Sequence, residues 1–122
     1  MTISHRHVDN ALNPAWRDAA VHLISSVSWD DTIPEDEAEK AIASVTNGTG
    51  YALRQLAPDS GVYYNETNPR EPHWQWAFWG PNYARALSVK PKYDPDSLLW
   101  CQHCVGSESY EQQKNGSLCA AF

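Results

Sequence analysis

A long alternating run over residues 13–29 constrains the fold more than any other feature of this 122-residue chain. Its apolar side chains recur with a period of two, at Val21, Leu23, Val27 and Trp29. Because successive side chains of a β-strand point to opposite faces, the run predicts one long strand with an apolar face and a mixed face. Such a strand is typical of an antiparallel sheet that is covered on one side. His22 falls on the mixed face, where it either lines a pocket or makes a structural hydrogen bond.

Helical patterns follow this run. Thr32-Ile33-Pro34-Glu35 forms a capping box and predicts a helix start, because the Thr hydroxyl can accept a backbone amide while the Glu reaches back. We expect this helix to end at Asn47-Gly48-Thr49-Gly50, since Asn and two glycines favour left-handed or open backbone. The later elements are a helical turn over 51–56, a short strand Val62–Tyr64, a helix from Glu71-Pro72 to Gly80, and a helix from Asn82 to about Lys90 that Pro91 and Pro95 close.

These patterns predict an α+β fold in which antiparallel strands pack with about three helices. A chain of 122 residues forms one domain at most and buries only a modest core. We expect an N-terminal arm over 1–12, a domain over 13–108 and a mobile polar tail over 109–122.

The charge balance argues against two classes of partner. Nine Lys and Arg against 15 Asp and Glu give a net charge of −6, which disfavours nucleic acid and anionic membranes. The polar N-terminus lacks the apolar centre of a signal peptide, so a cytoplasmic protein is expected. Sequons at Asn47, Asn65 and Asn115 leave a secretory route as the alternative.

Cys101, Cys104 and Cys119 make an odd number of cysteines. The Cys-x-x-Cys pair is read as a local disulfide or as two free thiols. A structural zinc site needs four ligands, and the second half of this chain lacks the usual paired spacing, so no metal is expected.

Five blocks later in the chain carry a family resemblance, and two earlier blocks, Asn13-Pro14-Ala15-Trp16-Arg17 and Leu56-Ala57-Pro58-Asp59-Ser60-Gly61, extend it. The five later blocks are Gly61-Val62-Tyr63-Tyr64-Asn65-Glu66, Glu71-Pro72-His73-Trp74-Gln75, Phe78-Trp79-Gly80-Pro81-Asn82-Tyr83-Ala84-Arg85, Lys90-Pro91-Lys92-Tyr93-Asp94-Pro95-Asp96 and Leu99-Trp100-Cys101-Gln102-His103-Cys104-Val105-Gly106-Ser107-Glu108. In order and spacing these blocks resemble the C-terminal region of fungal berberine-bridge-enzyme-like oxidases. The likeness extends over about residues 10–110.

The resemblance implies a two-part FAD-linked enzyme, in which one domain binds the flavin and the other roofs the substrate site with an antiparallel sheet backed by helices. This chain resembles the C-terminal part of that substrate domain. It has no glycine-rich flavin-binding stretch and no Arg-Ser-Gly-Gly-His-like block. We therefore expect FAD to be the family's cofactor without being bound by this chain alone, and we expect a flavin-binding partner chain or a homodimer.

The same resemblance suggests the site residues. Tyr63 and Glu66 are the candidates for the catalytic base or for substrate positioning, since a closed pocket can tune the pKa of a phenol or carboxyl. Asn65, Asn82 and Tyr83 are the candidates for contact with the cofactor. The alternative is structural, with packed tyrosines, Asn65 in a turn and Asn82 as a helix cap.

Three functions follow as hypotheses. The first is the substrate side of an oxidoreductase acting on a small alcohol, sugar or secondary metabolite, with no redox activity expected of this chain alone. The second is a flavin-free binding protein, cyclase or isomerase for a small molecule. The third is an inactive truncation that exposes apolar faces and aggregates.

Overall fold

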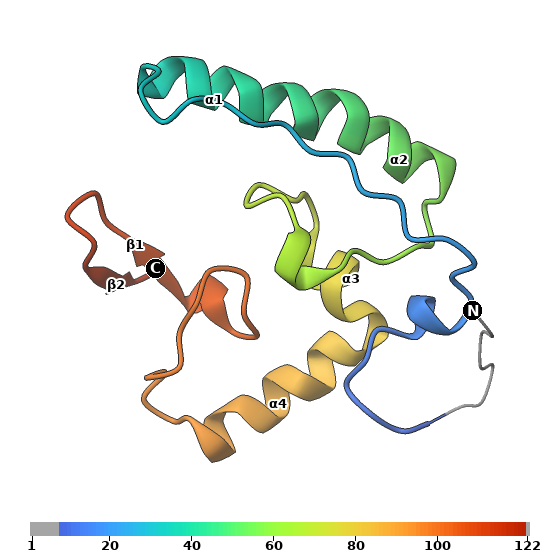
Figure 1. Cartoon of the computed structure of the whole chain (residues 1–122). Helices are drawn as coiled ribbons and strands as arrows, with labels where there is room; N and C mark the ends of the chain where they lie inside the picture. The colour runs from blue at the N-terminus through green and yellow to red at the C-terminus, as the bar shows by residue number, and fades with distance from the viewer. Residues whose placement is uncertain (1–7, 122) are drawn as a thin grey trace.

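The structure, a computed structural model, describes residues 8–121 (Figure 1). Residues 1–7, most of the expected N-terminal arm, lie outside the described residues. The elements are four α-helices and two strands joined by short 3-10 and π turns. In chain order they are the 3-10 turn Pro14–Arg17, α1 (Glu35–Ser44), a π turn (Val45–Thr49), α2 (Gly50–Leu56), the 3-10 turn Tyr64–Glu66, α3 (Trp74–Trp79), the 3-10 turn Gly80–Asn82, α4 (Tyr83–Tyr93), the 3-10 turn Ser107–Ser109, β1 (Tyr110–Gln112) and β2 (Leu118–Ala120).

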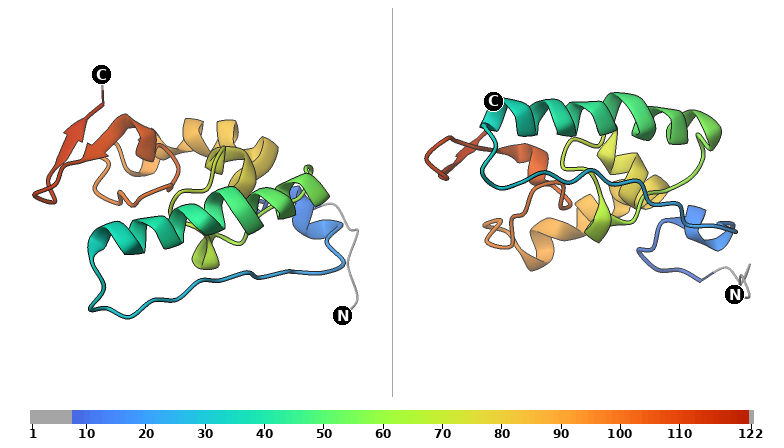
Figure 2. Two further views of the ribbon diagram at one scale, coloured as in Figure 1. Left: turned by 90° about the horizontal axis from the view of Figure 1, so that it is seen from above. Right: turned by 45° about the horizontal axis from the view of Figure 1, so that its top comes forward.

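The predicted long strand is wrong as a sheet element. It begins with the 3-10 turn Pro14–Arg17, and residues 21–30, which we call the strap, are extended without pairing to any described strand. The strap runs beside α1 and α2 in both views of Figure 2. Alternating side chains specify an extended backbone, but a sheet also needs a neighbouring strand, and residues 8–121 offer none here.

The predicted helix break at Asn47–Gly50 is also wrong. A π turn, Val45–Thr49, carries the helix from α1 into α2, and Gly50 keeps ordinary helical dihedrals of φ −62° and ψ −40°. Glycine and asparagine lower helix propensity by only about 1 kcal/mol each, which tertiary contacts can offset. The expected helical turn over 51–56 is confirmed as part of α2.

The start of α1 differs from the predicted capping box. Pro34 occupies the cap position, and no side chain caps the helix. The Thr32 hydroxyl instead donates to the Asp30 carboxylate, 2.6 Å away, and the Thr32 amide donates to the same oxygen. The Thr32 hydroxyl, which the capping box would have used as an acceptor for a helix amide, is therefore engaged in an Asx turn with Asp30.

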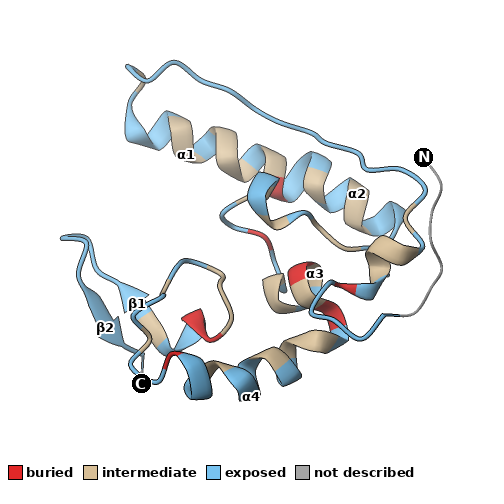
Figure 3. Cartoon of the chain, turned by 60° about the horizontal axis from the view of Figure 1, so that its bottom comes forward, coloured by how far each residue is buried: buried red, intermediate tan, exposed pale blue. Residues whose placement is uncertain are grey.

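The last two helices follow the expected order. α3 begins at Trp74 and not at the predicted Glu71-Pro72, but Gly80, whose φ of +54° suits glycine, follows its last residue as predicted. α4 continues through Pro91 to Tyr93, so the proline does not close it where we expected. Phe78 of α3, 5% exposed, is the buried hydrophobic side chain of the described part (Figure 3). Aromatic rings surround it, those of Tyr64, Trp74 and His103.

The C-terminal part folds back on itself. Cys101 and Cys104 form a disulfide, one of the two states expected for this pair, and Cys119 is free. In the tail that we expected to be mobile, β1 and β2 pair antiparallel with Glu111 opposite Cys119. The predicted strand Val62–Tyr64 is wrong, because its last residue begins a 3-10 turn. The α+β class is thus confirmed in outline, but its two strands lie outside the predicted ones.

Two absences hold for residues 8–121. They contain no helix with the length and apolar character required to cross a membrane. They also contain no cluster of three or more His, Cys, Asp or Glu residues suited to a metal ion.

Candidate functional site

A cavity of about 570 Å³ lies between residues 15–25 and α2. Both catalytic candidates, Tyr63 and Glu66, line it, and so do Trp16 and His22. The structure therefore brings residues from the N-terminal run, α2 and the tyrosine block to one space. His22 lies at a pocket, one of the two positions that the sequence left open.

Three rings meet at one end of this cavity. The ring centroids of Trp16 and His22 are 5.2 Å apart, and the Tyr63 ring lies 6.2 Å from Trp16 and 6.0 Å from His22. All three pairs are edge-to-face, a geometry that favours aromatic contacts. The Tyr63 ring is thus held at the cavity while it remains 42% exposed.

A short turn positions the candidates around Tyr63. The amide of Glu66 donates to the carbonyl of Tyr63 at 3.2 Å and closes the 3-10 turn Tyr64–Glu66. The side-chain Nδ2 of Asn65 donates to the Tyr63 hydroxyl at 3.0 Å. Asn65, a cofactor candidate in the sequence, therefore contacts the catalytic candidate directly. Its bond occupies an acceptor position of the phenol and leaves the phenol proton available to a ligand.

A buried ion pair forms a second wall. Arg54 Nη1 lies 3.2 Å from Glu71 Oε1, and the Glu71 side chain is only 7% exposed. Arg54 Nη2 also donates to the Thr46 carbonyl at 2.7 Å, and Asn68 donates to the Thr46 hydroxyl at 2.6 Å. Burial raises the pKa of Glu71, and the nearby Arg54 opposes this only in part. This network joins α2 and the π turn to the loop before α3.

The other two cofactor candidates lie elsewhere. Neither Asn82 nor Tyr83 lines the cavity. Asn82 stands at the helix cap position, but its side chain donates to the Leu12 carbonyl at 2.8 Å and does not cap α4. Its role in residues 8–121 is to hold the N-terminal segment.

Tyr83 holds the C-terminal loop. Its hydroxyl donates to Glu108 Oε1 at 2.5 Å and accepts from the Gly106 amide at 3.2 Å. Burial and the hydrogen bond to Glu108 raise the pKa of Tyr83 to about 12. The phenol is therefore neutral at physiological pH.

Sequence reasoning missed the organising role of Asn13. This side chain is 4% exposed and donates to the Ala77 carbonyl at 3.1 Å, while its Oδ1 accepts from the Ala15 amide. Gly61 and Gly80 both pack against it, so closely that a Cβ at either position would lie within 3 Å of its amide group. The signals in the sequence were the Asn-Pro step and the place of Asn13 in the block Asn13-Pro14-Ala15-Trp16-Arg17, which belongs to the family resemblance.

Comparison with known proteins connects this arrangement to a family. Residues 62–106 match the family described as berberine and berberine like. The chain is 44% identical over 104 residues to the FAD-linked oxidoreductase ffsJ of Aspergillus flavipes, an alignment that covers 85% of this chain and 17% of that protein. The chain is homologous to the C-terminal region of fungal FAD-linked oxidoreductases. This berberine-bridge segment carries Tyr63, Glu66, Tyr83 and the disulfide within its matched range.

Two further relatives give the same result. The VAO-type flavoprotein oxidase VAO615 of Thermothelomyces thermophilus is 38% identical over 123 residues, covering 94% of this chain and 20% of that protein. The crystal structure of the VAO-type flavoprotein MtVAO713 from Myceliophthora thermophila C1 superposes with a TM-score of 0.80 at 34% identity, covering 91% of this chain and 19% of that one. The chain thus spans about a fifth of the length of the relatives that it matches.

Three glycines of the chain do not form a cradle for the phosphates of FAD. A pyrophosphate cradle needs glycine amides that a phosphate can approach closely. Here the Asn13 side chain occupies the space beside Gly61 and Gly80, and the Gly106 amide already donates a hydrogen bond to the Tyr83 hydroxyl. The relatives are FAD-linked by name, but Gly61, Gly80 and Gly106 present no such cradle in this chain.

Proposed function

We propose that the chain forms the substrate side of an FAD-dependent oxidoreductase that oxidises a small alcohol, sugar or secondary metabolite, with a flavin-binding half supplied from elsewhere. The observation that carries this proposal is the strap, residues 21–30. An extended, alternating segment without a partner strand has the form of a sheet component whose neighbours belong to other polypeptide.

The exposure of the strap supports this step. Val21, Leu23 and Ile24 are 69%, 61% and 63% exposed. Residues 21–29 make no backbone-to-backbone hydrogen bond with any other part of 8–121. A segment with unpaired backbone and exposed apolar side chains favours pairing with a complementary strand. Pairing satisfies the backbone hydrogen-bonding groups, and burial of the apolar side chains lowers the free energy.

The cavity gives the chain a role in the chemistry. Tyr63 and Glu66 both line it, so one of them takes the proton from the substrate and the other orients the substrate by hydrogen bonding. Asn65 fixes the Tyr63 hydroxyl through its 3.0 Å bond. Under this proposal the hydride acceptor belongs to the other half, and no step through it is assigned to this chain.

The cavity also supports the second function, flavin-free binding of a small apolar molecule. A space of about 570 Å³ lined by Trp16, His22 and Tyr63 has the size of a small-molecule site. Under this alternative the purified chain binds its ligand in the absence of flavin and of any other protein.

The test is to purify the chain alone and together with a flavin-binding half taken from a homologous FAD-linked oxidoreductase. We expect the chain alone to be colourless and inactive, and the pair to copurify, show flavin absorbance and oxidise members of an alcohol and sugar panel. A matched pair of strap variants provides the control. Leu23→Lys places a charge on the apolar face and should abolish copurification, whereas Ser26→Lys, on the mixed face, should not.

Two results would contradict the proposal. A yellow chain that turns over an alcohol unaided would show that no second half is needed. A colourless chain that binds a panel compound but never pairs with a flavin-binding half would favour the flavin-free alternative.

A further inference from the structure

We propose that Tyr64 is a positioning residue that couples the Cys101–Cys104 disulfide to the turn carrying Tyr63 and Glu66. Under this proposal the redox state of the disulfide sets the order of that turn. The coupling itself is a property of this chain, and only its importance for catalysis rests on the proposed function.

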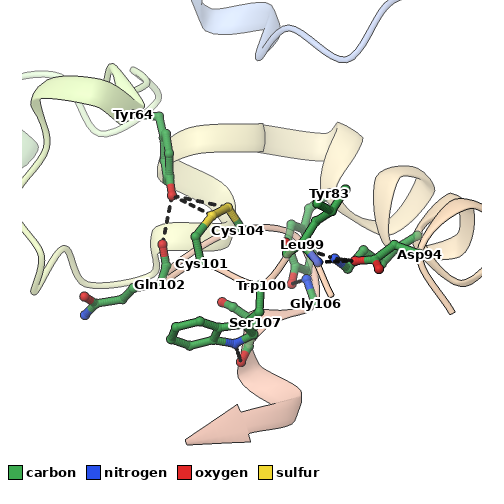
Figure 4. The surroundings of a disulfide bond; sticks show 11 residues. Tyr64, Tyr83, Asp94, Leu99, Trp100, Cys101, Gln102, Cys104, Gly106 and Ser107 are labelled. Atoms are coloured by element: carbon green, nitrogen blue, oxygen red, sulfur yellow. Dashed lines mark hydrogen bonds and ion pairs between the residues drawn. A yellow bond between two sulfur atoms is a disulfide. The ribbon is translucent and has the colours of Figure 1, made fainter. Parts of the chain in front are cut away.

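The Tyr64 side chain reaches the disulfide directly. Its hydroxyl donates to the Gln102 carbonyl at 2.9 Å and lies 3.5 Å from Cys101 Sγ and 3.4 Å from Cys104 Sγ (Figure 4). The hydroxyl has one proton and donates it in the hydrogen bond to the carbonyl, so the two sulfur atoms are packing contacts of the hydroxyl oxygen. The ring is fixed from the other side by Phe78, 5.3 Å away and edge-to-face.

The disulfide loop presents the Gln102 carbonyl in a defined direction. The Cys104 amide donates to the Cys101 carbonyl at 3.1 Å, so the four residues form a tight turn that the disulfide closes. His103 within the turn has φ +60°, a conformation that a non-glycine residue rarely adopts, and its ring stacks on Trp74 at 5.0 Å. Opening the disulfide removes the covalent closure that keeps His103 in this conformation and the carbonyl facing Tyr64.

The 3-10 turn Tyr64–Glu66 has few hydrogen bonds of its own. Residues Tyr64–Glu66 form a single 3-10 turn closed by one backbone hydrogen bond, from the Glu66 amide to the Tyr63 carbonyl at 3.2 Å. Asn65 bonds only within the turn, to Tyr63. A one-bond turn is ordered mainly by side-chain anchors: the Tyr63 ring contacts Trp16 and His22, and Tyr64 supplies the anchor to the C-terminal loop. Loss of that anchor therefore loosens Tyr63 and Glu66 at the cavity.

The disulfide is accessible to a reductant. Cys101 is exposed and Cys104 is half-buried. A small dithiol attacks one sulfur as its thiolate, breaks the S–S bond and forms a mixed disulfide, and its second thiolate then displaces the cysteine. The chain gains two electrons and two protons as two thiols, and the dithiol leaves as a cyclic disulfide.

Hydrogen–deuterium exchange on the full 122-residue chain tests the coupling, comparing the oxidised protein with protein reduced by dithiothreitol. Within residues 64–67 the Glu66 amide carries the backbone hydrogen bond, and we expect its exchange to be roughly five- to tenfold faster after reduction, the change expected for loss of one hydrogen bond. Exchange in α1 should stay unchanged and serves as the internal reference. Cys119→Ser, which removes the free thiol alone, is the matched control and should behave as wild type.

Tyr64→Phe separates coupling from loop structure. In this variant we expect the Glu66 amide to exchange fast already in the oxidised protein and to respond little to reduction. Because coupling is reciprocal, the same variant should make the disulfide easier to reduce by the same factor. A five- to tenfold shift corresponds to about 20 to 30 mV in the reduction potential against dithiothreitol.

Three outcomes would overturn the proposal. These are unchanged exchange of the Glu66 amide on reduction, a full response to reduction in Tyr64→Phe, and accelerated exchange in α1, which would mean that reduction unfolds the chain as a whole. The experiment needs neither flavin nor a second polypeptide. Its failure is therefore distinguishable from failure of the flavin-pairing test.

Discussion

Asn65 donates its side-chain amide to the hydroxyl of Tyr63 across 3.0 Å, two residues apart in one 3-10 turn. The bond holds the hydroxyl of Tyr63, a residue that lines the same cavity as Glu66. The family resemblance suggests Asn65 as a cofactor contact and Tyr63 as the catalytic base or a substrate-positioning residue. In the structure these two side chains form one unit, and this relationship orders the effects expected of their variants.

In the enzyme completed by a flavin-binding half, Tyr63→Phe should lower kcat by roughly 10²- to 10⁴-fold if the phenol is the base, the usual contribution of a general base. Glu66→Gln should then act mainly on KM. Asn65→Ala should give a smaller loss of kcat than Tyr63→Phe, and little further loss when the two are combined, since both act through the same oxygen. Steady-state kinetics of the three single variants and the double variant measure this. Independent, multiplying effects of Asn65→Ala and Tyr63→Phe would show that the bond has no catalytic role.

The Arg54–Glu71 pair should be sensitive to the loss of one partner. Arg54→Met leaves the buried Glu71 carboxylate unpaired and removes the bond to the Thr46 carbonyl. A broken buried pair costs about 3–5 kcal/mol, and because the Arg54 side chain is 28% exposed we expect the lower end, roughly 3 kcal/mol. Adding Glu71→Leu should restore much of the free energy of unfolding. Urea denaturation of the single and double variants checks this, and Lys40→Met, which breaks an exposed pair with Asp36, should cost less than about 1 kcal/mol.

Two buried carboxyls should affect stability in opposite directions with pH. Burial raises the pKa of Glu71 in the folded chain above its ordinary value of 4.5. The folded state then holds this proton more tightly than the unfolded state, so the contribution is fully present below pH 4.5 and is lost as pH rises through the folded pKa.

Asp94 behaves in the other sense. The hydrogen bond from Lys90, aided by the amides of Leu98 and Leu99, holds the pKa of Asp94 below its ordinary value of 3.8. Its stabilisation is present above pH 3.8 and is lost as pH falls through the folded pKa. On lowering the pH from neutrality, Glu71→Gln should therefore become progressively less stable relative to wild type, and Asp94→Asn progressively more stable. Thermal unfolding over a pH series measures both differences, and parallel curves for the two variants would contradict the assignment.

The glycines differ sharply in how far they tolerate a side chain. At Gly80, with φ +54°, an added Cβ would lie 2.7 Å from Asn13 Oδ1, so Gly80→Ala should destabilise the chain by about 2 kcal/mol or more. At Gly48 no atom lies within 4 Å of an added Cβ and the backbone is helical, so Gly48→Ala should stabilise by about 0.5–1 kcal/mol. Denaturant midpoints of the two variants test this. A stabilising Gly80→Ala would show that Asn13 does not occupy that position.

The sequence was most informative about local backbone. The alternation at 13–29 correctly indicated extended chain for the strap, the Trp74–Trp79 helix ended at Gly80 as expected, and the blocks around Tyr63, Asn82 and Cys101 indicated the family. Each of these signals is encoded in neighbouring residues or in residue order. The error at Asn47–Gly50 had a different origin, because weak local propensity there was overridden by contacts from Arg54 and Asn68.

The spatial grouping of the site was decided only by the tertiary structure. Side chains from three separated segments meet at the cavity, Tyr64 reaches a disulfide 37 residues along the chain, and Asn13 fits against Gly61 and Gly80. No local pattern encodes such contacts, because they depend on which surfaces pack together once the helices form. The strap also shows that a local pattern does not specify tertiary contacts. Its alternation specifies a strand, but pairing requires a second strand, and that partner is not encoded in the strap itself.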